Sequence, residues 1–178
     1  NSFHGRTLAT CTATGQYGVH RYFEPLPTGF RYAEFNNLDS VKAIMDEYVC
    51  AILTEPVQGE GGVRPASKEF LQGLRDLCDE KGILLMFDEV QVGSGRTGKL
   101  FAHQNYGVEP DTCSMAKALG SGVPIGAVCA RGEAASTLTP GTHGSTFAGG
   151  PLACALAATT LDVMINEGVI ENSRKMGE

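Results

Sequence analysis

Two short apolar runs separated by an amphipathic segment constrain this fold most. Residues 49–54 read VCAILT and residues 83–87 read ILLMF, so both runs are apolar on both faces of a strand. Such runs are typical of parallel strands covered by helices on both faces. Between them, apolar residues recur at the spacing of one helical face: Phe70, Leu71, Leu74, Leu77 and Cys78. This pattern predicts an α/β fold with a mainly parallel sheet flanked by helices.

The ends of the central helix carry their own signals. Ser67 is placed to cap the first turn, where Glu69 complements the helix dipole. Lys81 and Gly82 suit the last turn and the stop. We therefore expect a helix from just after Ser67 to just before Gly82.

The rest of the chain extends the sheet. Further strands are expected at 111–115 and 124–130, followed by a helix over 151–168. Pro151 suits the first turn of that helix and Gly168 its end. Because this helix is apolar on most sides, we expect it to be buried. Residues 7–15 favour neither a strand nor a short helix.

Composition excludes several classes of protein. Of 178 residues, 42% are hydrophobic and 19% charged, which allows one domain with a sizeable core. The net charge is −6 and no Lys or Arg run occurs, so neither a nucleic acid nor an anionic membrane is an expected partner. No apolar run approaches the roughly 20 residues that span a bilayer. We expect a soluble, cytoplasmic protein.

Cysteine and histidine spacing predicts no metal site. The six cysteines form no CxxC pair and the four histidines are scattered. We expect the cysteines to be small buried hydrophobes: Cys11, Cys50, Cys78, Cys113, Cys129 and Cys154.

Three charged residues follow three of the expected strands. Glu55 comes after 49–54, Asp88 after 83–87, and Lys117 just after 111–115. If the strands are parallel, all three reach the sheet edge where ligands bind in open α/β folds. Acidic residues also leave strands simply for solvent, so Glu55 alone is as readily structural as functional. Glu89 should face away from Asp88, because neighbours on a strand alternate.

Lys117 lies among small residues in SMAKALGSG. A lysine whose pKa is lowered by burial and nearby positive charge can form a Schiff base with an aldehyde. If the aldehyde is pyridoxal 5'-phosphate (PLP), Asp88 is placed to keep the ring nitrogen protonated. Ser145 and Thr146, in HGSTFAGG, offer donors for the phosphate.

Five ordered segments resemble the class III, ornithine aminotransferase-like PLP transaminases: SFHGRT, EPVQGEGG, FDEVQVGSGRTGK, SMAKALGSGVPIGA and GTHGSTFAGGPLACA. Within that family, GFRYAEFNNLDSV and the helix with its following strand are most similar to acetylornithine aminotransferase. The similarity runs from residue 1 to about residue 165. It implies a fold-type I enzyme, usually a homodimer with shared active sites.

The resemblance implies a role for each matching residue. Lys117 would be catalytic, holding PLP and carrying the proton in transamination, while Thr146 would reach the phosphate of the partner's cofactor. The implied cofactor-binding set is Phe3, Asp88, Glu89, Val90, Gln91, Lys117 and Thr146. The implied substrate contacts are Arg6, Glu60 and Ser145. Phe3 would stack on the ring, and Gln91 would approach its phenolic oxygen.

The implied reaction is transamination between N-acetylornithine and 2-oxoglutarate in arginine biosynthesis. The alternatives within the family are ornithine, succinylornithine, 4-aminobutyrate, diaminopelargonate and glutamate-semialdehyde enzymes. Residues 1–178 match only a large PLP-binding domain, so we expect an N-terminal segment with the phosphate loop and a C-terminal small domain to lie outside. Alone, the fragment should be nearly inactive. Gly150 stands where the family usually has asparagine.

Two readings compete with this one. The segment GSGRTGK, residues 93–99, fits both a P-loop and a dinucleotide fingerprint. However, Leu100 occupies the place of the P-loop Ser or Thr, and the glycines do not directly follow the strand. We therefore interpret the segment as a glycine-rich turn, with Lys99 structural. The other reading is a non-catalytic α/β domain.

Overall fold

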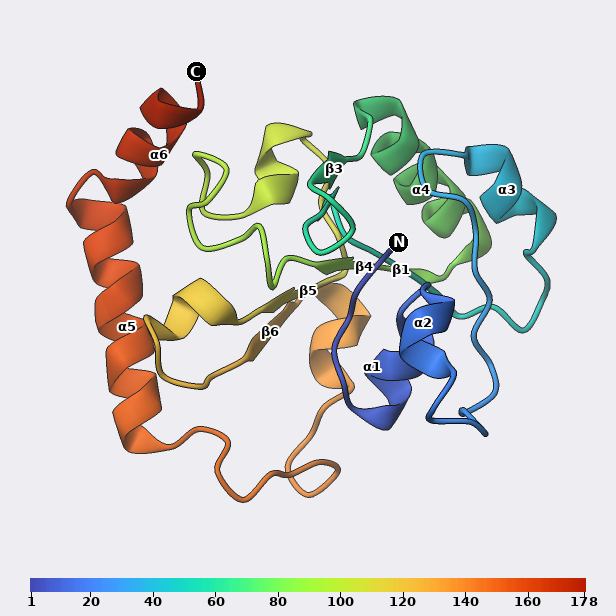
Figure 1. Ribbon diagram of the computed structural model, residues 1–178, viewed down its shortest axis with the longest axis horizontal. Helices are drawn as coiled ribbons and strands as arrows, with labels where there is room; N and C mark the ends of the chain where they lie inside the picture. Colours follow the sequence, from blue (N-terminus) through green and yellow to red (C-terminus); the bar gives the residue numbers. More distant parts are fainter.

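The computed structural model describes residues 1–178 and is built around a four-stranded sheet. Its strands lie in the order β1 (Ala51–Thr54), β4 (Leu84–Asp88), β5 (Thr112–Met115) and β6 (Ala127–Ala130) (Figure 1). β1, β4 and β5 run parallel, and β6 is antiparallel to β5. The mainly parallel sheet is thus confirmed. The strand expected at 124–130 is shorter, because only its last four residues pair with β5.

Helices and short turns surround the sheet. Before β1 lie α1 (Leu8–Ala13), α2 (Tyr17–His20) and α3 (Leu38–Ala43). The undecided segment 7–15 is therefore mainly helical. A small antiparallel pair, β2 (Val57–Gln58) and β3 (Arg64–Pro65), precedes α4 (Lys68–Lys81). The remaining elements are η1 (Ala102–Asn105), η2 (Lys117–Gly120), η3 (Gly132–Ser136), α5 (Pro151–Asn166) and α6 (Val169–Gly177).

α4 begins and ends as its sequence predicts. The Ser67 side chain accepts a hydrogen bond from Phe70 N at 3.0 Å, which satisfies one free N–H of the first turn. Gly82 ends the helix at φ 63°, a left-handed conformation that glycine adopts without steric cost. Glu69 and Lys81 complement the dipole at the two ends.

The main core lies between α4 and the sheet. Leu71 and Leu74 of α4 pack with Leu85 and Phe87 of β4, and all four are at most 1% exposed. Burying each such side chain stabilises the fold by about 1.5–3 kcal/mol. Because Phe87 directly precedes Asp88, this packing fixes the end of β4 where the charged residues lie.

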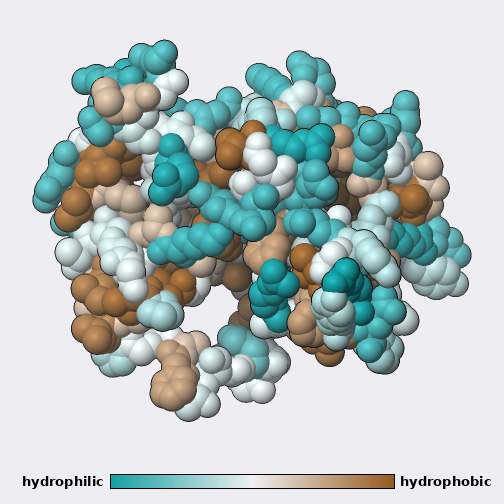
Figure 2. All heavy atoms as spheres, in the orientation of Figure 1, coloured by the Kyte–Doolittle hydropathy of each residue, from teal (hydrophilic) through white to brown (hydrophobic).

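α5 is not buried, contrary to the expectation from its composition. Only Ala157 and Met164 are buried, while Leu152 is 72% and Ile165 58% exposed. The helix packs on η2 and α6, so one face is covered and the others are not. Apolar atoms accordingly appear along α5 at the left edge of the molecule (Figure 2).

The cysteines also divide into buried and exposed residues. Cys11, Cys78 and Cys113 are buried as predicted, but the prediction is wrong for the other three: Cys50, Cys129 and Cys154. β6 and α5 carry two of these, because each element has a face that nothing in the chain covers. No single helix has the length and apolar character of a membrane span, although α5 and α6, bent by 61°, pass that test together.

Candidate active site

Strand register brings the three charged residues to one edge of the sheet. Thr54 is paired with Phe87, and Asp88 with Ser114. Glu55, Asp88 and Lys117 consequently lie at the carboxyl ends of three neighbouring parallel strands, as the sequence predicts.

Asp88 is held by three hydrogen bonds. Its Oδ2 lies 2.8 Å from His4 Nδ1, and its Oδ1 accepts from Val90 N at 3.0 Å and Ser114 Oγ at 3.1 Å. Burial pushes the pKa of Asp88 upward, but the hydrogen bonds, that of His4 first among them, leave it below its ordinary value. A buried carboxylate that stays ionised suits a partner that carries a positive N–H.

Glu55 is engaged entirely by backbone. It is 2% exposed; Oε1 accepts from Phe3 N at 2.9 Å, and Oε2 accepts from Gly59 N at 3.1 Å. Burial raises the pKa of this carboxyl, and the two N–H groups offset that only in part. Glu55 thereby joins the backbone at Phe3 to the backbone at Gly59.

Lys117 begins η2 directly after β5. Its φ is 46°, in the left-handed region that a side chain adopts at a cost of about 1 kcal/mol or more. The residue is exposed, so the small residues around it do not cover its side chain. Leu119 and Gly120 of η2 are the buried residues, because they pack under α5.

The N-terminal segment crosses the strand ends (Figure 1). It supplies Phe3, with the Arg6 guanidinium 5.3 Å from the ring centroid, a cation–π arrangement. It also supplies His4, which sequence reasoning missed because an isolated histidine has no spacing signal. Its ring is buried against Asp88, 84 positions away.

The turn after β4 carries the remaining residues of the DEVQ motif. Val90 donates its N–H to Asp88, and Gln91 is half-buried against Gly59, where an added Cβ would lie 2.9 Å from the glutamine side chain. Glu60, the next residue after Gly59, is exposed.

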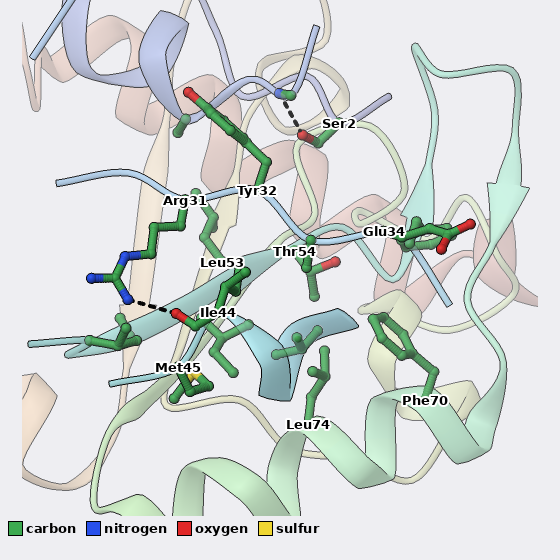
Figure 3. Close-up of a pocket in the computed structure, with 18 of the residues that line it drawn as sticks. Ser2, Arg31, Tyr32, Glu34, Ile44, Met45, Leu53, Thr54, Phe70 and Leu74 are labelled. Carbon is green, nitrogen blue, oxygen red and sulfur yellow. Dashed lines mark hydrogen bonds between the residues drawn. The ribbon is translucent and has the colours of Figure 1, made fainter. Parts of the chain in front are cut away.

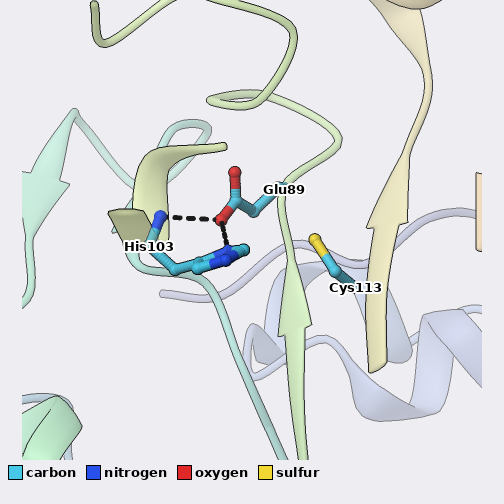
Figure 4. A group of neighbouring side chains, drawn as sticks. All are labelled: Glu89, His103 and Cys113. Atoms are coloured by element: carbon cyan, nitrogen blue, oxygen red, sulfur yellow. Dashed lines mark hydrogen bonds and ion pairs between the residues drawn. The ribbon is translucent and has the colours of Figure 1, made fainter. Parts of the chain in front are cut away.

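Glu89 faces away from Asp88, as strand alternation predicts. Its Oε1 accepts from His103 N at 2.8 Å and lies 2.8 Å from His103 Nδ1, while Oε2 accepts from Ala102 N (Figure 4). With Cys113, the three side chains form a cluster of the kind that can hold a metal ion. Burial and the nearby carboxylate of Glu89 raise the pKa of the Cys113 thiol, and both carboxylate oxygens are in use. We therefore interpret the cluster as a hydrogen-bonded brace, and the absence of a metal stays a prediction.

The expected phosphate and substrate donors are less tightly placed. Ser145 and Thr146 are exposed, in the connection that leads from η3 to α5 at the bottom of Figure 1. Gly150 is the N-cap of α5, without a side chain to satisfy the first turn.

The segment 93–99 forms turns rather than the strand-to-helix junction of a nucleotide site. Gly95, at φ 82°, lies against Ile170, and Gly98, at φ 78°, lies against Arg174. Ser173 Oγ donates to Arg96 O at 2.9 Å. The glycines thus allow close packing on α6, in line with a structural role, and Lys99 is exposed.

A cavity of about 330 Å³ lies elsewhere, beside β1 (Figure 3). Ile44, Met45, Leu53 and Leu74 line its apolar part, and Arg31 closes one side by donating to Ile44 O at 2.6 Å. Asp88 and Lys117 do not line this cavity.

A mainly parallel sheet with a buried aspartate and a lysine at adjacent strand ends fits a PLP-dependent enzyme of fold type I. The donor set fits that cofactor: one carboxylate for the ring nitrogen and one primary amine for the aldehyde. The family model for class-III aminotransferases matches residues 1–178, and the chain belongs to that family. Class-III aminotransferases are PLP-dependent.

Several relatives are similar over nearly the whole chain. Succinylornithine transaminase of Salmonella paratyphi A is 55% identical over 172 residues, which are 97% of this chain and 42% of that protein. The ornithine aminotransferase structure from Toxoplasma gondii has a TM-score of 0.93 at 38% identity, covering 99% of this chain and 42% of that one. N-acetylornithine aminotransferase from Stenotrophomonas maltophilia has a TM-score of 0.71 at 42% identity, covering 82% and 38%. The chain therefore spans about 42% of the length of the curated relatives it matches.

Proposed function

We propose that residues 1–178 are the large PLP-binding domain of an aminotransferase that transfers the amino group of N-acetylornithine to 2-oxoglutarate. The products are N-acetylglutamate 5-semialdehyde and glutamate, and the reaction belongs to arginine biosynthesis. The observation that carries the proposal is Asp88, buried and ionised at the end of β4, on the strand next to the one that Lys117 follows.

Each residue has a physical task in this reaction. When bound, PLP supplies an electron sink that stabilises negative charge on the substrate carbon. The carboxylate of Asp88 would accept the N–H of the pyridine ring, and the hydrogen bonds of His4 and Ser114 favour the ionised form of that carboxylate. Lys117 Nζ would hold the aldehyde group of the cofactor and, once released from it, would carry a proton between the amine-bearing carbon of the substrate and the cofactor.

The other proposed contacts complete the site. Phe3 would stack on the ring and Gln91 would lie near the phenolic oxygen, while Val90 and Glu89 support the turn after Asp88. In a cytoplasmic homodimer, Thr146 reaches the phosphate of the partner's cofactor, which its exposed position allows. Arg6, Glu60 and Ser145 are the proposed substrate contacts, and all three are exposed to an incoming ligand.

N-succinylornithine is the second candidate donor, because a succinylornithine transaminase shares 55% identity with this chain. Both donors are N-acylated ornithines that present the same δ-amino group to the cofactor. They differ in the acyl group, and the succinyl group adds a carboxylate. Comparing kcat/KM for N-acetylornithine, N-succinylornithine, ornithine and 4-aminobutyrate separates the candidates. A preference for 4-aminobutyrate would contradict both acylornithine assignments.

Cofactor attachment is tested on the full-length protein that contains this chain. Borohydride reduction followed by peptide mapping should place the PLP label on Lys117. Lys117→Ala should abolish the label and the transamination, whereas Lys99→Ala, at an exposed lysine of the glycine-rich turn, should keep both. A label on any other lysine would overturn the proposal.

A further inference from the structure

We propose that Glu55 is a positioning residue, which fixes the two backbone segments that carry Phe3 and support Gln91 around the cofactor. The inference rests on the proposed function, because it concerns where those two side chains lie when PLP is bound. It gives a role to a carboxylate at the edge of the site that makes none of the proposed contacts with cofactor or substrate.

The side chain of Glu55 links two backbone segments. The carboxylate receives one N–H on each oxygen, from Phe3 at 2.9 Å and from Gly59 at 3.1 Å. These donors come from segments that are far apart in sequence, since Phe3 precedes Glu55 by 52 positions. At 2% exposure, water does not compete for the two oxygens that accept these N–H groups. Glu55 forms no ion pair within 4 Å with any cation of the chain, so backbone is its partner.

In the N-terminal segment, the consecutive residues Phe3 and His4 are bound at the ends of two neighbouring strands. Glu55, after β1, binds the backbone of Phe3, and Asp88, at the end of β4, binds the side chain of His4. The N–H of His4 is also held, by Thr14 Oγ at 2.9 Å. The backbone at Phe3 is therefore fixed on both sides of the residue, and this sets where its ring can lie.

Through Gly59, Glu55 also fixes a close contact between the backbone and the Gln91 side chain. Gly59 lies so near Gln91 that an added Cβ would meet the glutamine side chain at 2.9 Å. The hydrogen bond from Gly59 N to Glu55 holds the glycine in that place. Loss of this hydrogen bond would let the Gly59 backbone, against which Gln91 packs, change position. It would also free the backbone next to Glu60, a proposed substrate contact.

Glu55 is a poor candidate for acid–base work in the reaction. The residue is 2% exposed, and the titratable groups that affect its pKa, His4 and Asp88, are paired with each other. Loss of Glu55 should therefore disturb cofactor geometry rather than remove a proton carrier.

The test uses the full-length holoenzyme with Glu55→Gln, which keeps the size of the side chain but turns an NH₂ group toward one of the two N–H donors. We expect the dissociation constant for PLP to rise about tenfold or more, with a loss of visible circular dichroism from the bound cofactor. The matched control is Asp111→Asn. Asp111 also accepts a backbone N–H, from Leu85 at 2.8 Å, but at the opposite ends of the strands. This control should change stability while keeping PLP affinity within about twofold.

The outcomes separate the two proposals. If wild-type protein carries no PLP, or the borohydride label is not on Lys117, the proposed function fails. If wild type is labelled at Lys117 and Glu55→Gln matches it in affinity and circular dichroism, only the role of Glu55 is overturned. If Glu55→Gln does not fold, Glu55→Asp replaces it, because a side chain shorter by one methylene reaches only one donor. Wild-type affinity in that variant would overturn the inference equally.

Discussion

His4 Nδ1 and Asp88 Oδ2 lie 2.8 Å apart, with only 4% and 10% of the two side chains exposed. The histidine comes from the N-terminal segment and the aspartate from β4, so the pair ties the first residues of the chain to the centre of the sheet. It also joins the neighbour of Phe3 to the carboxylate proposed for the cofactor nitrogen. The position and the charge of Asp88 therefore depend on the same contact.

Replacing His4 should weaken cofactor binding through Asp88. His4→Ala removes the hydrogen-bond partner that contributes most to lowering the pKa of Asp88, so we expect PLP affinity to fall about 10- to 100-fold. His4→Asn keeps an N–H donor near the place of Nδ1 and should recover most of the affinity. Equilibrium binding of PLP to the two full-length variants measures the difference. Equal affinity in the alanine variant and wild type would mean that Val90 and Ser114 suffice to hold Asp88.

Stability should depend on pH through Asp88 in a defined direction. Its pKa in the folded protein lies below the ordinary 3.8, so the stabilisation is present above that value and is lost as the pH falls through the lowered pKa. Urea unfolding between about pH 6 and pH 2 should show this acid limb in wild type. Asp88→Asn cannot titrate and should flatten it. A difference between wild type and variant that stays constant over the whole range would contradict the assignment.

The start of α4 should respond to loss of its cap. Ser67→Ala removes the acceptor for Phe70 N and should lower the free energy of unfolding by about 1 kcal/mol. Lys68→Ala, at the next exposed position, should change it by no more than about 0.5 kcal/mol. Denaturant unfolding of both variants checks this. A loss as large for Lys68→Ala as for Ser67→Ala would show that the cap is not its source.

The success of sequence reasoning follows how local each signal is. The limits of α4 are encoded within a few residues, by Ser67 and Gly82, and were predicted correctly. The meeting of Glu55, Asp88 and Lys117 follows from parallel strand order alone. The contact between His4 and Asp88 could not be predicted, because it joins residues 84 positions apart without a motif.

Helix burial failed for a related reason. α5 is apolar around most of its circumference, and such a pattern says that a helix can be buried without saying what covers it. Within this chain only η2 and α6 pack on it substantially, so Leu152 and Ile165 stay exposed. The exposure of Lys117 has the same cause, because its small neighbours in the sequence do not determine which parts of the chain cover the amine.

The cluster of Glu89, His103 and Cys113 should behave as a brace and not as a metal centre. A chelator should leave the unfolding midpoint unchanged, and added Zn²⁺ at equimolar amounts should not raise it. Glu89→Ala should cost about 3 kcal/mol or more, because it leaves Ala102 N and His103 without their buried acceptor. Thermal unfolding with and without chelator checks the first point, and denaturant unfolding the second. A midpoint that rises with Zn²⁺ in wild type but not in Cys113→Ala would instead establish a metal site.

The glycine-rich turn offers a test of its structural role against α6. Gly98 has φ 78°, and a Cβ there would lie 2.8 Å from Arg174 Cβ, so Gly98→Ala combines backbone strain with a collision. Gly107 has a similar φ of 69° with nothing within 4 Å, so Gly107→Ala carries the strain alone. Both variants should be destabilised, by about 1 kcal/mol for the strain, and Gly98→Ala by roughly 1–3 kcal/mol more for the overpacking. Because Arg174 lies on α6, hydrogen exchange should rise in α6 for Gly98→Ala only. Equal destabilisation of the two variants would mean that the turn tolerates separation from α6, and close packing would no longer explain its glycines.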